Sequence, residues 1–313
     1  MNIMKLSKGI LSYIPGLCRM FSKGTGGTDS ARYCYSVLLR HLVKAYNNQL
    51  PTNPKVVAEL GPGDSLGTGL AALISGADHY YGFDVIEYST NQRNFEIFDE
   101  LVELFKNREK IPGEDEFPMV RPCLDTYEFP GHILTDERLN ESLRSDRIAS
   151  IKNALSNLGK KNDQILIAYF VPWDDIKVMK EESVDMLFTQ TVMQLVDNLP
   201  NAYRVISRWL KTGGFMSHSL DFTCYRAAEK WNGYWAYSDF FWKLMKGKRP
   251  CLVNRSPHSA HIQLMEDYGF KIVCDNQIRD MAGIKRSQLA SRFRNLSDDD
   301  LIISGAFVQA IKK

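Results

Sequence analysis

The stretch Val-Val-Ala-Glu-Leu-Gly-Pro-Gly-Asp-Ser-Leu-Gly, residues 56–67, decides the fold of this chain. It begins as a short apolar run that ends in the acid Glu59, and it then breaks into a turn at Gly61 and Gly63. A helix-like segment follows over 66–75. This order predicts a buried strand, a tight turn and the start of a helix, a geometry that lets a nucleotide-like ligand lie against backbone. Glycine suits the turn because a Cβ would hinder a positive φ and the close approach of a ligand.

A second apolar run, 80–83, ends in Asp84, which lies 21 residues after Gly63. An acid at that distance can accept hydrogen bonds from ribose hydroxyls. NAD fits poorly, because Gly67 comes one residue too late for G-x-G-x-x-G and because Glu59 stands where that fingerprint takes an apolar residue. A carboxylate there favours a ligand with a cation and no pyrophosphate. S-adenosylmethionine (SAM), with its sulfonium and ammonium groups, meets this description.

From Glu59 to Phe222 the chain resembles the class I SAM-dependent methyltransferases. The likeness rests on the order of the glycine turn and three later blocks: Ser-Val-Asp-Met-Leu-Phe-Thr-Gln at 183–190, Val-Met-Gln-Leu-Val at 192–196, and 203–215 with its Leu-Lys-Thr-Gly-Gly turn. These blocks look like the family's fourth strand, the segment after it, and the helix and turn before the fifth strand. The chain departs from the family pattern at three positions: Ser65 for the third glycine, Leu195 for a frequent His, and Thr212 for the usual Pro.

The resemblance implies SAM as the cofactor and a set of residues that hold it. Gly61 and Gly63 are expected to line its methionine part, Asp84 to hold its ribose, and Glu59 to organise the turn and the ammonium end. Arg32 lies in a glycine-rich segment where this family often folds a lid, and it is expected to pair with the methionine carboxylate; the alternative is a solvent-facing arginine in a linker. The expected cofactor-binding residues are Glu59, Gly61, Gly63, Asp84, Arg32, Thr189 and Gln190.

Alternating strand and helix patterns predict an α/β fold, a doubly wound, mostly parallel, seven-stranded Rossmann-like sheet with an antiparallel closing pair. Residues 1–52 are expected to form an N-terminal helical lid segment, and 53–313 the SAM-binding domain. Two insertions, at about 88–160 and 223–262, are expected to form a helical and loop cap. The first is polar and proline-marked, and we expect it to become helical only from about 139 to 158.

Methyl transfer to a hydroxyl needs a general base or a metal, because a hydroxyl is a weak nucleophile at neutral pH. His218 and Asp221, at the end of the expected fifth strand, are the first candidates. His218 is expected to take the proton, with Asp221 orienting it or acting itself. The alternative is a histidine that is hydrogen-bonded in a loop. Two ligands are too few to predict a metal site.

The region 229–261 is dense in aromatic, amide and basic side chains, which suit the faces and hydroxyls of a saccharide. The alternative is that its tryptophans, at near-helical spacing, are core anchors. The pattern from Gly26 through 231–232 to 254–255 resembles a methyltransferase subgroup of bacterial surface-polysaccharide biosynthesis. That resemblance implies O-methylation of a saccharide or glycan precursor; a small apolar or lipid-like acceptor and a non-catalytic scaffold are the alternatives. The expected substrate-binding residues are Asn232, Trp235, Asn254, Arg255 and His258.

Composition limits the partners and the compartment. The net charge of +2 argues against a nucleic-acid-binding protein, which usually presents a strongly basic face. Six cysteines without a C-x-x-C pair indicate a reducing, cytoplasmic compartment and no zinc site. Residues 1–23 combine apolar and basic side chains with no acid, and we expect a helix packed on its own domain. The alternative for these residues is a basic amphipathic helix at the inner face of a membrane. The oligomeric state is not indicated.

Overall fold

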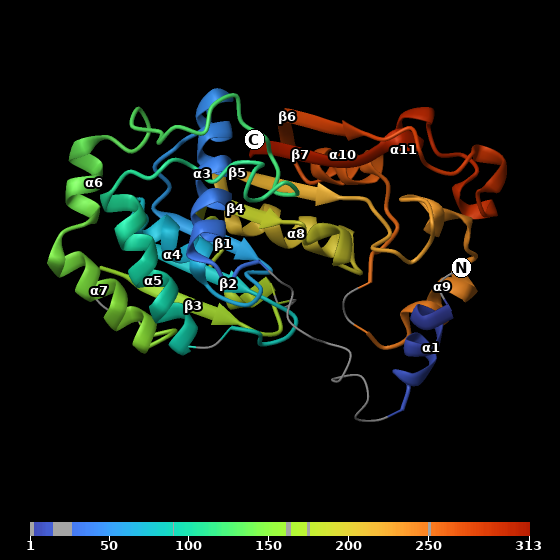
Figure 1. Ribbon diagram of the computed structural model, residues 1–313, viewed down its shortest axis with the longest axis horizontal. Coiled ribbons are helices and arrows are strands. Elements are labelled where there is room, and N and C mark those ends of the chain that lie inside the picture. The colour runs from blue at the N-terminus through green and yellow to red at the C-terminus, as the bar shows by residue number, and fades with distance from the viewer. Residues whose placement is uncertain (1–2, 15–26, 90, 161–163, 174–175, 250–251) are drawn as a thin grey trace.

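A computed structural model describes the chain except residues 1–2, 15–26, 90, 161–163, 174–175 and 250–251 (Figure 1). Its centre is a seven-stranded sheet in the order β3-β2-β1-β4-β5-β7-β6. The first five strands in this order run parallel, β7 is antiparallel to β5, and β6 is antiparallel to β7. The strands are β1 Val56–Leu60, β2 His79–Phe83, β3 Leu166–Phe170, β4 Val184–Gln190, β5 Leu210–Asp221, β6 Phe270–Arg279 and β7 Ile303–Lys312. The predicted fold class is confirmed, including the antiparallel closing pair.

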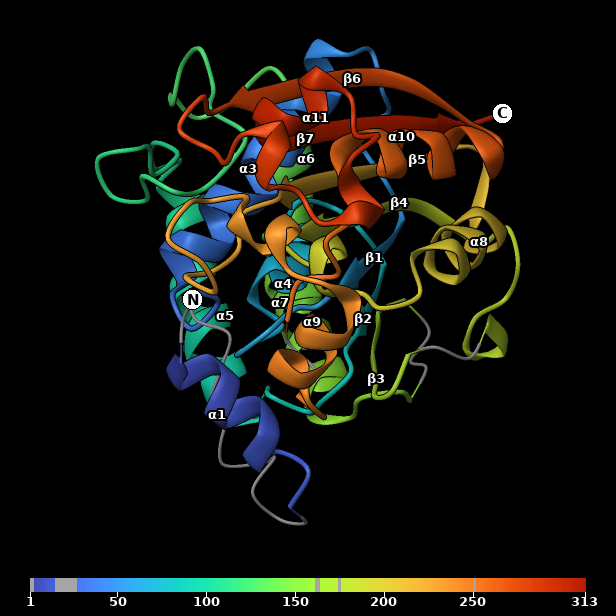
Figure 2. The same cartoon turned by 90° about the vertical axis from the view of Figure 1, so that its right-hand side faces the viewer.

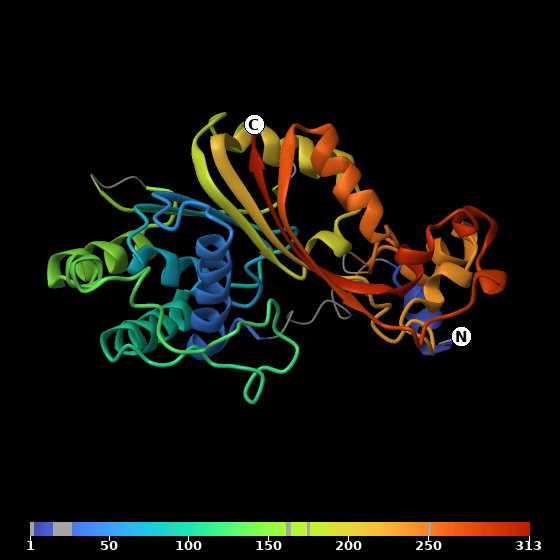
Figure 3. The same cartoon turned by 90° about the horizontal axis from the view of Figure 1, so that it is seen from above.

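Helices cover both faces of the sheet, so the fold is doubly wound (Figure 3). One face carries α3 (Ala31–Asn47), α4 (Gly67–Ile74), α5 (Asn91–Lys106) and α7 (Ser145–Ser156), whose apolar side chains share one core with the sheet. The other face carries α8 (Leu199–Trp209) and α10 (His258–Asp267), which share a second core. Burial of strands on both faces explains why β1 is apolar over almost its full length.

The segment after β2 differs from its prediction. The expectation of an irregular link up to about residue 139 is wrong, because α5 begins at Asn91 and buries Ile97, Phe98, Leu101 and Phe105 in the first core. This part of the expected insertion is therefore a regular covering helix of the sheet. Two shorter helices follow the loop 107–135: α6 (Asp136–Ser142) and then α7.

A third, smaller core holds a cap together at the right-hand end of the molecule in Figure 1, the end that faces the viewer in Figure 2. Buried residues of 224–245 together with Leu252 and Val253 supply one part of it, and the connection between β6 and β7 supplies the other through Leu289 and Phe293. The cap contains α9 (Asp239–Lys246), and α1 (Ile3–Leu11) lies against α9. Nothing in the sequence pattern had indicated the second part. The remaining short helices are η1 Ile176–Val178, η2 Met193–Leu195, η3 Gly233–Ala236, η4 Arg286–Gln288, η5 Ser291–Phe293 and α11 Asp298–Ile302. Among the described residues, the helices are too short or too polar to cross a membrane.

Candidate functional site

The glycine turn leaves β1 with two left-handed residues. Gly61 has φ +70° and Gly63 has φ +78°, and the Gly61 N–H donates to the carbonyl oxygen of Phe83 at the end of β2 (2.7 Å). A Cβ on Gly61 would lie 2.5 Å from Cγ2 of Val192, in the segment after β4. Glycine is therefore required at this position both by its backbone conformation and by its neighbour.

Asp84 joins the end of β2 to this turn. Its carboxylate accepts hydrogen bonds from the backbone N–H groups of Val85 (2.7 Å), Ile86 and Gly63. Burial raises the pKa of Asp84, and these hydrogen bonds oppose that rise. The carboxylate and the glycine turn, 21 residues apart in sequence, are thus in direct contact at the carboxyl ends of two adjacent parallel strands.

Glu59 lies one residue before the end of β1 and points into the first core. The Tyr80 hydroxyl donates to its Oε2 (2.6 Å), and the Thr68 hydroxyl contacts the same carboxylate. Room for the Tyr80 ring comes from Gly69 of α4, where a Cβ would lie only 2.0 Å from that ring. Burial raises the pKa of Glu59 to about 8. Because the side chain is 2% exposed, the geometry supports a role in bracing the strand and α4, and it gives no support to contact with an ammonium group.

Residues just before α3 lie over the turn. The N–H of Asp64 donates to the Thr28 hydroxyl (2.7 Å), and the Ser65 hydroxyl donates to the Thr28 carbonyl oxygen. Gly26 lies outside the described residues. Arg32 points elsewhere, because its guanidinium makes a bidentate ion pair with Glu116 (2.6 and 2.8 Å). The expected pairing of Arg32 with a methionine carboxylate would require it to leave this partner.

The ends of β4 and β5 form a closed polar network. Thr189 Oγ1 and His218 Nδ1 share a hydrogen bond (2.9 Å), and His218 Nε2 faces only Met216 Sδ (3.2 Å). Burial lowers the pKa of His218 to about 3, and the side chain has no exposed surface. The Gln190 side chain is also hydrogen-bonded within the protein, since its Oε1 lies 3.2 Å from Nε2 of His41. This arrangement contradicts the expected role of His218 as a general base, because an acceptor cannot reach an imidazole that is fully buried between Thr189 and Met216.

Asp221, at the end of β5, remains half-buried and belongs to a second polar cluster. Its Oδ1 accepts the N–H of Thr223 (2.8 Å), and its carboxylate also meets the hydroxyl of Tyr225. That hydroxyl accepts a hydrogen bond from Nε2 of Gln194 (2.8 Å), in η2 after β4. Gln194 is 2% exposed, and its Oε1 has no hydrogen-bond partner among the described atoms. A buried polar atom without a partner is rare in proteins, and this oxygen is one of five such side-chain atoms among the described residues.

Sequence reasoning missed Gln194 and Tyr225. Gln194 lies inside the quoted block 192–196, but only the tertiary structure shows that its oxygen is buried and unpaired. Tyr225 and Arg226 both have positive φ, 45° and 61°, a conformation that costs free energy for residues with a side chain. No residue type around 225–226 would have indicated this backbone conformation from the sequence.

Three of the expected substrate-binding residues are internal supports, two in the cap and one, His258, between α10 and β6. The Trp235 indole N–H donates to the Arg255 carbonyl oxygen (3.0 Å), and both side chains are buried. The Arg255 guanidinium pairs with Asp239, and His258 Nε2 lies 2.8 Å from Oδ1 of Asp275 in β6. These contacts contradict the expectation that the three side chains face an acceptor.

The two asparagines of that set hold loops in place. The Asn232 amide donates to the Leu301 carbonyl oxygen (3.1 Å) and accepts the N–H of Ile284 (2.6 Å), which ties the two parts of the cap together. The Asn254 amide donates to the Met193 carbonyl oxygen (2.9 Å) and so fixes η2 after β4. Their amide groups satisfy buried backbone atoms, so the expected contact with a saccharide is contradicted for them as well.

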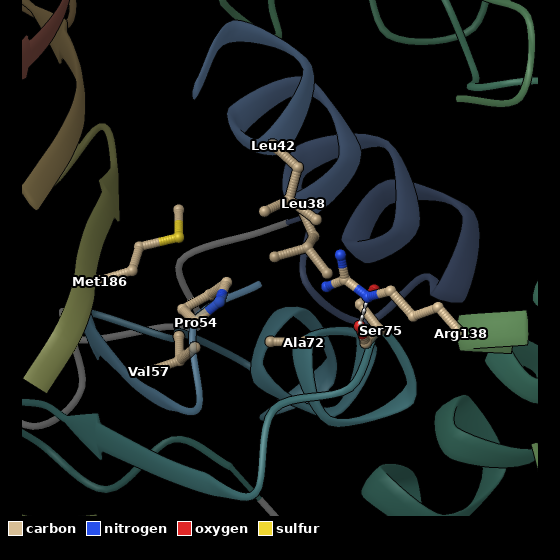
Figure 4. Close-up of a pocket in the computed structure, with 8 residues that line it drawn as sticks. All are labelled: Leu38, Leu42, Pro54, Val57, Ala72, Ser75, Arg138 and Met186. Atoms are coloured by element: carbon tan, nitrogen blue, oxygen red, sulfur yellow. Dashed lines mark hydrogen bonds between the residues drawn. The ribbon is translucent and has the colours of Figure 1, made fainter. Parts of the chain in front are cut away.

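A small cavity lies at the opposite end of the sheet (Figure 4). It measures about 10 Å³, room for roughly one water molecule, near the amino ends of β1 and β4. Arg138 of α6 closes it and donates from Nε to the Ser75 carbonyl oxygen (2.7 Å). Ligands in such sheets bind at the carboxyl ends of the strands, so this cavity is not the site.

No protein-family model matches the chain, and a search of curated proteins gives no match. Among solved structures, it is similar to a proposed SAM-dependent methyltransferase from Listeria monocytogenes (12% identity, 87% of this chain and 98% of the other, TM-score 0.42). It is also similar to a SAM-dependent methyltransferase from Mesorhizobium loti (12%, 87% and 98%, TM-score 0.40) and to a TehB-like one from Corynebacterium glutamicum (11%, 88% and 89%, TM-score 0.36).

Proposed function

We propose that this chain is a SAM-dependent methyltransferase that binds SAM at the carboxyl ends of β1 and β2. The observation that carries the proposal is the contact between the Asp84 carboxylate and the Gly63 N–H. In open parallel sheets, ligands lie where neighbouring strands lead away to opposite sides. β1 is such a strand, since β2 and β4 flank it.

The residues of the turn fit this ligand. Gly61 and Gly63 both have positive φ and no side chain to obstruct a ligand, and Asp84 offers a carboxylate that backbone donors already orient. Asp84 would accept hydrogen bonds from the ribose hydroxyls, and the turn would admit the methionine part without steric conflict. When bound, SAM supplies a methyl group on a cationic sulfur with a neutral leaving group, so the protein's main task is to position the acceptor.

The cluster of Asp221, Tyr225 and Gln194 supports a hydroxyl acceptor, and we propose a saccharide or glycan precursor. Asp221 would accept the proton of the attacking hydroxyl, in place of His218. Oε1 of Gln194, which is buried and has no partner among the described atoms, would accept a hydrogen bond from a second hydroxyl once the Tyr225 side chain moves away from it. An acceptor with several hydroxyls can satisfy both groups, whereas an apolar alcohol would leave the Gln194 oxygen unpaired.

The proposed compartment is the cytoplasm. The four described cysteines Cys34, Cys123, Cys224 and Cys274 carry free thiols, as is usual in a reducing compartment. The net charge of +2 supports a small-molecule acceptor over a nucleic acid.

Titration calorimetry with SAM tests the cofactor, and methyl transfer to a panel of sugars and apolar alcohols tests the acceptor. We expect heat of binding for SAM and transfer to polyhydroxylated acceptors. Absence of binding at sub-millimolar SAM would favour a non-catalytic scaffold. Binding with transfer only to apolar alcohols would retain the methyltransferase and overturn the saccharide.

A further inference from the structure

Helix α1 lies against α9 (Figures 1 and 2), with Leu6 packed on the third core. At Gly9 a Cβ would lie 2.3 Å from the carbonyl oxygens of both Leu244 and Met245, so the two backbones are in contact there. Three residues later, the Ser12 hydroxyl accepts the N–H of Lys248 (2.8 Å). The side of α1 that carries Gly9 and Ser12 therefore faces the protein.

The other side of α1 is apolar and exposed. Met4, Ile10 and Leu11 are 67%, 51% and 42% exposed, and Phe240 on α9 is 74% exposed. Of the thirteen large hydrophobic residues that are exposed in the described part of the chain, six belong to 4–14 or are Phe240. A helix that serves only to cover its own domain turns its apolar side inward. Here the apolar side is directed outward.

Exposed lysines border this apolar face, namely Lys8, Lys243 and Lys248. Lys5, Lys246 and Arg249 bind the Tyr225 carbonyl oxygen, Asp197 and backbone carbonyl oxygens. Residues 3–14 and 239–249 carry six cationic side chains and one acid: Lys5, Lys8, Lys243, Lys246, Lys248 and Arg249 against Asp239. Asp239 pairs with Arg255 and Arg292. Since the whole chain carries only +2, this positive charge is a local property of the two helices.

We propose that the α1–α9 surface docks on a lipid bilayer that carries anionic headgroups. This surface is defined as Met4, Lys8, Ile10, Leu11, Tyr13, Ile14, Phe240, Lys243 and Lys248. Apolar side chains flanked by lysines fit the boundary between lipid headgroups and acyl chains. The apolar side chains enter the acyl region, and the lysines meet the anionic headgroups. The sequence had indicated residues 1–23 alone, of which 15–23 lie outside the described part. The structure adds α9 and the direction of the apolar face.

Flotation with vesicles tests the proposal, using phosphatidylcholine alone and phosphatidylcholine mixed with phosphatidylglycerol. The parent protein is expected to bind the anionic vesicles more tightly and to lose binding as salt is raised. The double variant I10S/L11S should lower the partition coefficient at least about tenfold, because two apolar side chains no longer enter the membrane. The double variant K8E/K243E should remove the preference for anionic vesicles.

Met4→Ser and Met119→Ser form a matched pair, since both methionines are exposed and only Met4 belongs to the α1–α9 surface. Met4→Ser should weaken binding and Met119→Ser should not. An equal loss in both variants, or a parent protein that floats with neither kind of vesicle, overturns the proposal. Sedimentation that shows a dimer abolished by I10S/L11S also overturns it, by assigning the surface to a second copy of the chain. Melting temperatures close to that of the parent establish that each variant is folded.

Discussion

Replacing Glu59 with glutamine is expected to change how the stability of the protein depends on pH. Burial raises the pKa of Glu59 to about 8, so this carboxyl group is mostly protonated in the folded protein at neutral pH. In the unfolded chain it ionises near the ordinary value of 4.5. Glutamine resembles the neutral acid in shape and can still accept the hydrogen bond from Tyr80, but it does not titrate.

The direction in which stability changes with pH follows from proton linkage. A group whose pKa is raised on folding contributes stability that is fully present below its unfolded pKa and is lost as pH rises toward its folded pKa. Between pH 5.5 and 7.5 the parent should therefore lose about 2–3 kcal/mol from Glu59, at about 1.4 kcal/mol for each pH unit. The variant lacks this loss. Burial lowers the pKa of His41 to about 4 and of His218 and His261 to about 3, but these groups titrate alike in both proteins and cancel in the difference.

Urea unfolding at pH 5.5, 6.5 and 7.5 measures the effect as the difference in unfolding free energy between parent and variant. This difference should shift by about 2–3 kcal/mol across the range, with Glu59→Gln gaining relative stability as pH rises. Glu100→Gln, at an exposed position of α5, is the control and should give a difference that does not vary with pH. A pH-independent difference for Glu59→Gln would refute the conclusion that Glu59 is held as a neutral acid.

Three further outcomes are expected. Asp84→Asn should weaken SAM binding by about 1–2 kcal/mol in calorimetry, because ribose hydroxyls would lose a charged acceptor; unchanged affinity would remove Asp84 from the site. Asp221→Asn should lower turnover at least about 100-fold while SAM affinity stays the same, if Asp221 is the base; equal losses in both would indicate a structural role. Gly69→Ala should lower the unfolding free energy by more than about 2 kcal/mol because its Cβ would overlap the Tyr80 ring, whereas Gly131→Ala, with nothing within 4 Å, should change it by less than about 1 kcal/mol. A similar loss in both glycine variants would contradict the packing seen around Tyr80.

The sheet could be predicted from the sequence because its signals are local. Apolar runs bounded by turns at 56–60, 80–83 and 184–189 correspond to β1, β2 and β4 within a residue. The contact between the glycine turn and Asp84 was also predictable, since parallel neighbouring strands bring their carboxyl ends to one edge of the sheet. Helix α5 was missed because prolines further along the same segment made the whole segment read as a loop.

The polar residues of the cap show why site prediction was less successful. Asn254, Arg255 and His258 looked unsuited to a core, yet each satisfies a buried backbone atom or an acid that comes from a distant part of the chain. His218 looked accessible because it stands near the end of a strand, but Thr189 and Met216 enclose it. The partners of these cap and α10 residues lie between 16 and 61 residues away in sequence (Arg255 to Asp239 and Asn254 to Met193), so sequence spacing alone does not reveal them.

The sequence by itself determined the α/β sheet, the turn at Gly61 and Gly63, and the acid at Asp84, because strand, turn and helix propensities act over a few neighbouring residues. Only the tertiary structure decided which polar side chains are hydrogen-bonded in the interior and which are not, such as Gln194, whose Oε1 has no partner among the described atoms. The physical reason is that folding determines which groups lie beside a donor or acceptor. Residue type alone does not show whether that donor or acceptor has a hydrogen-bond partner.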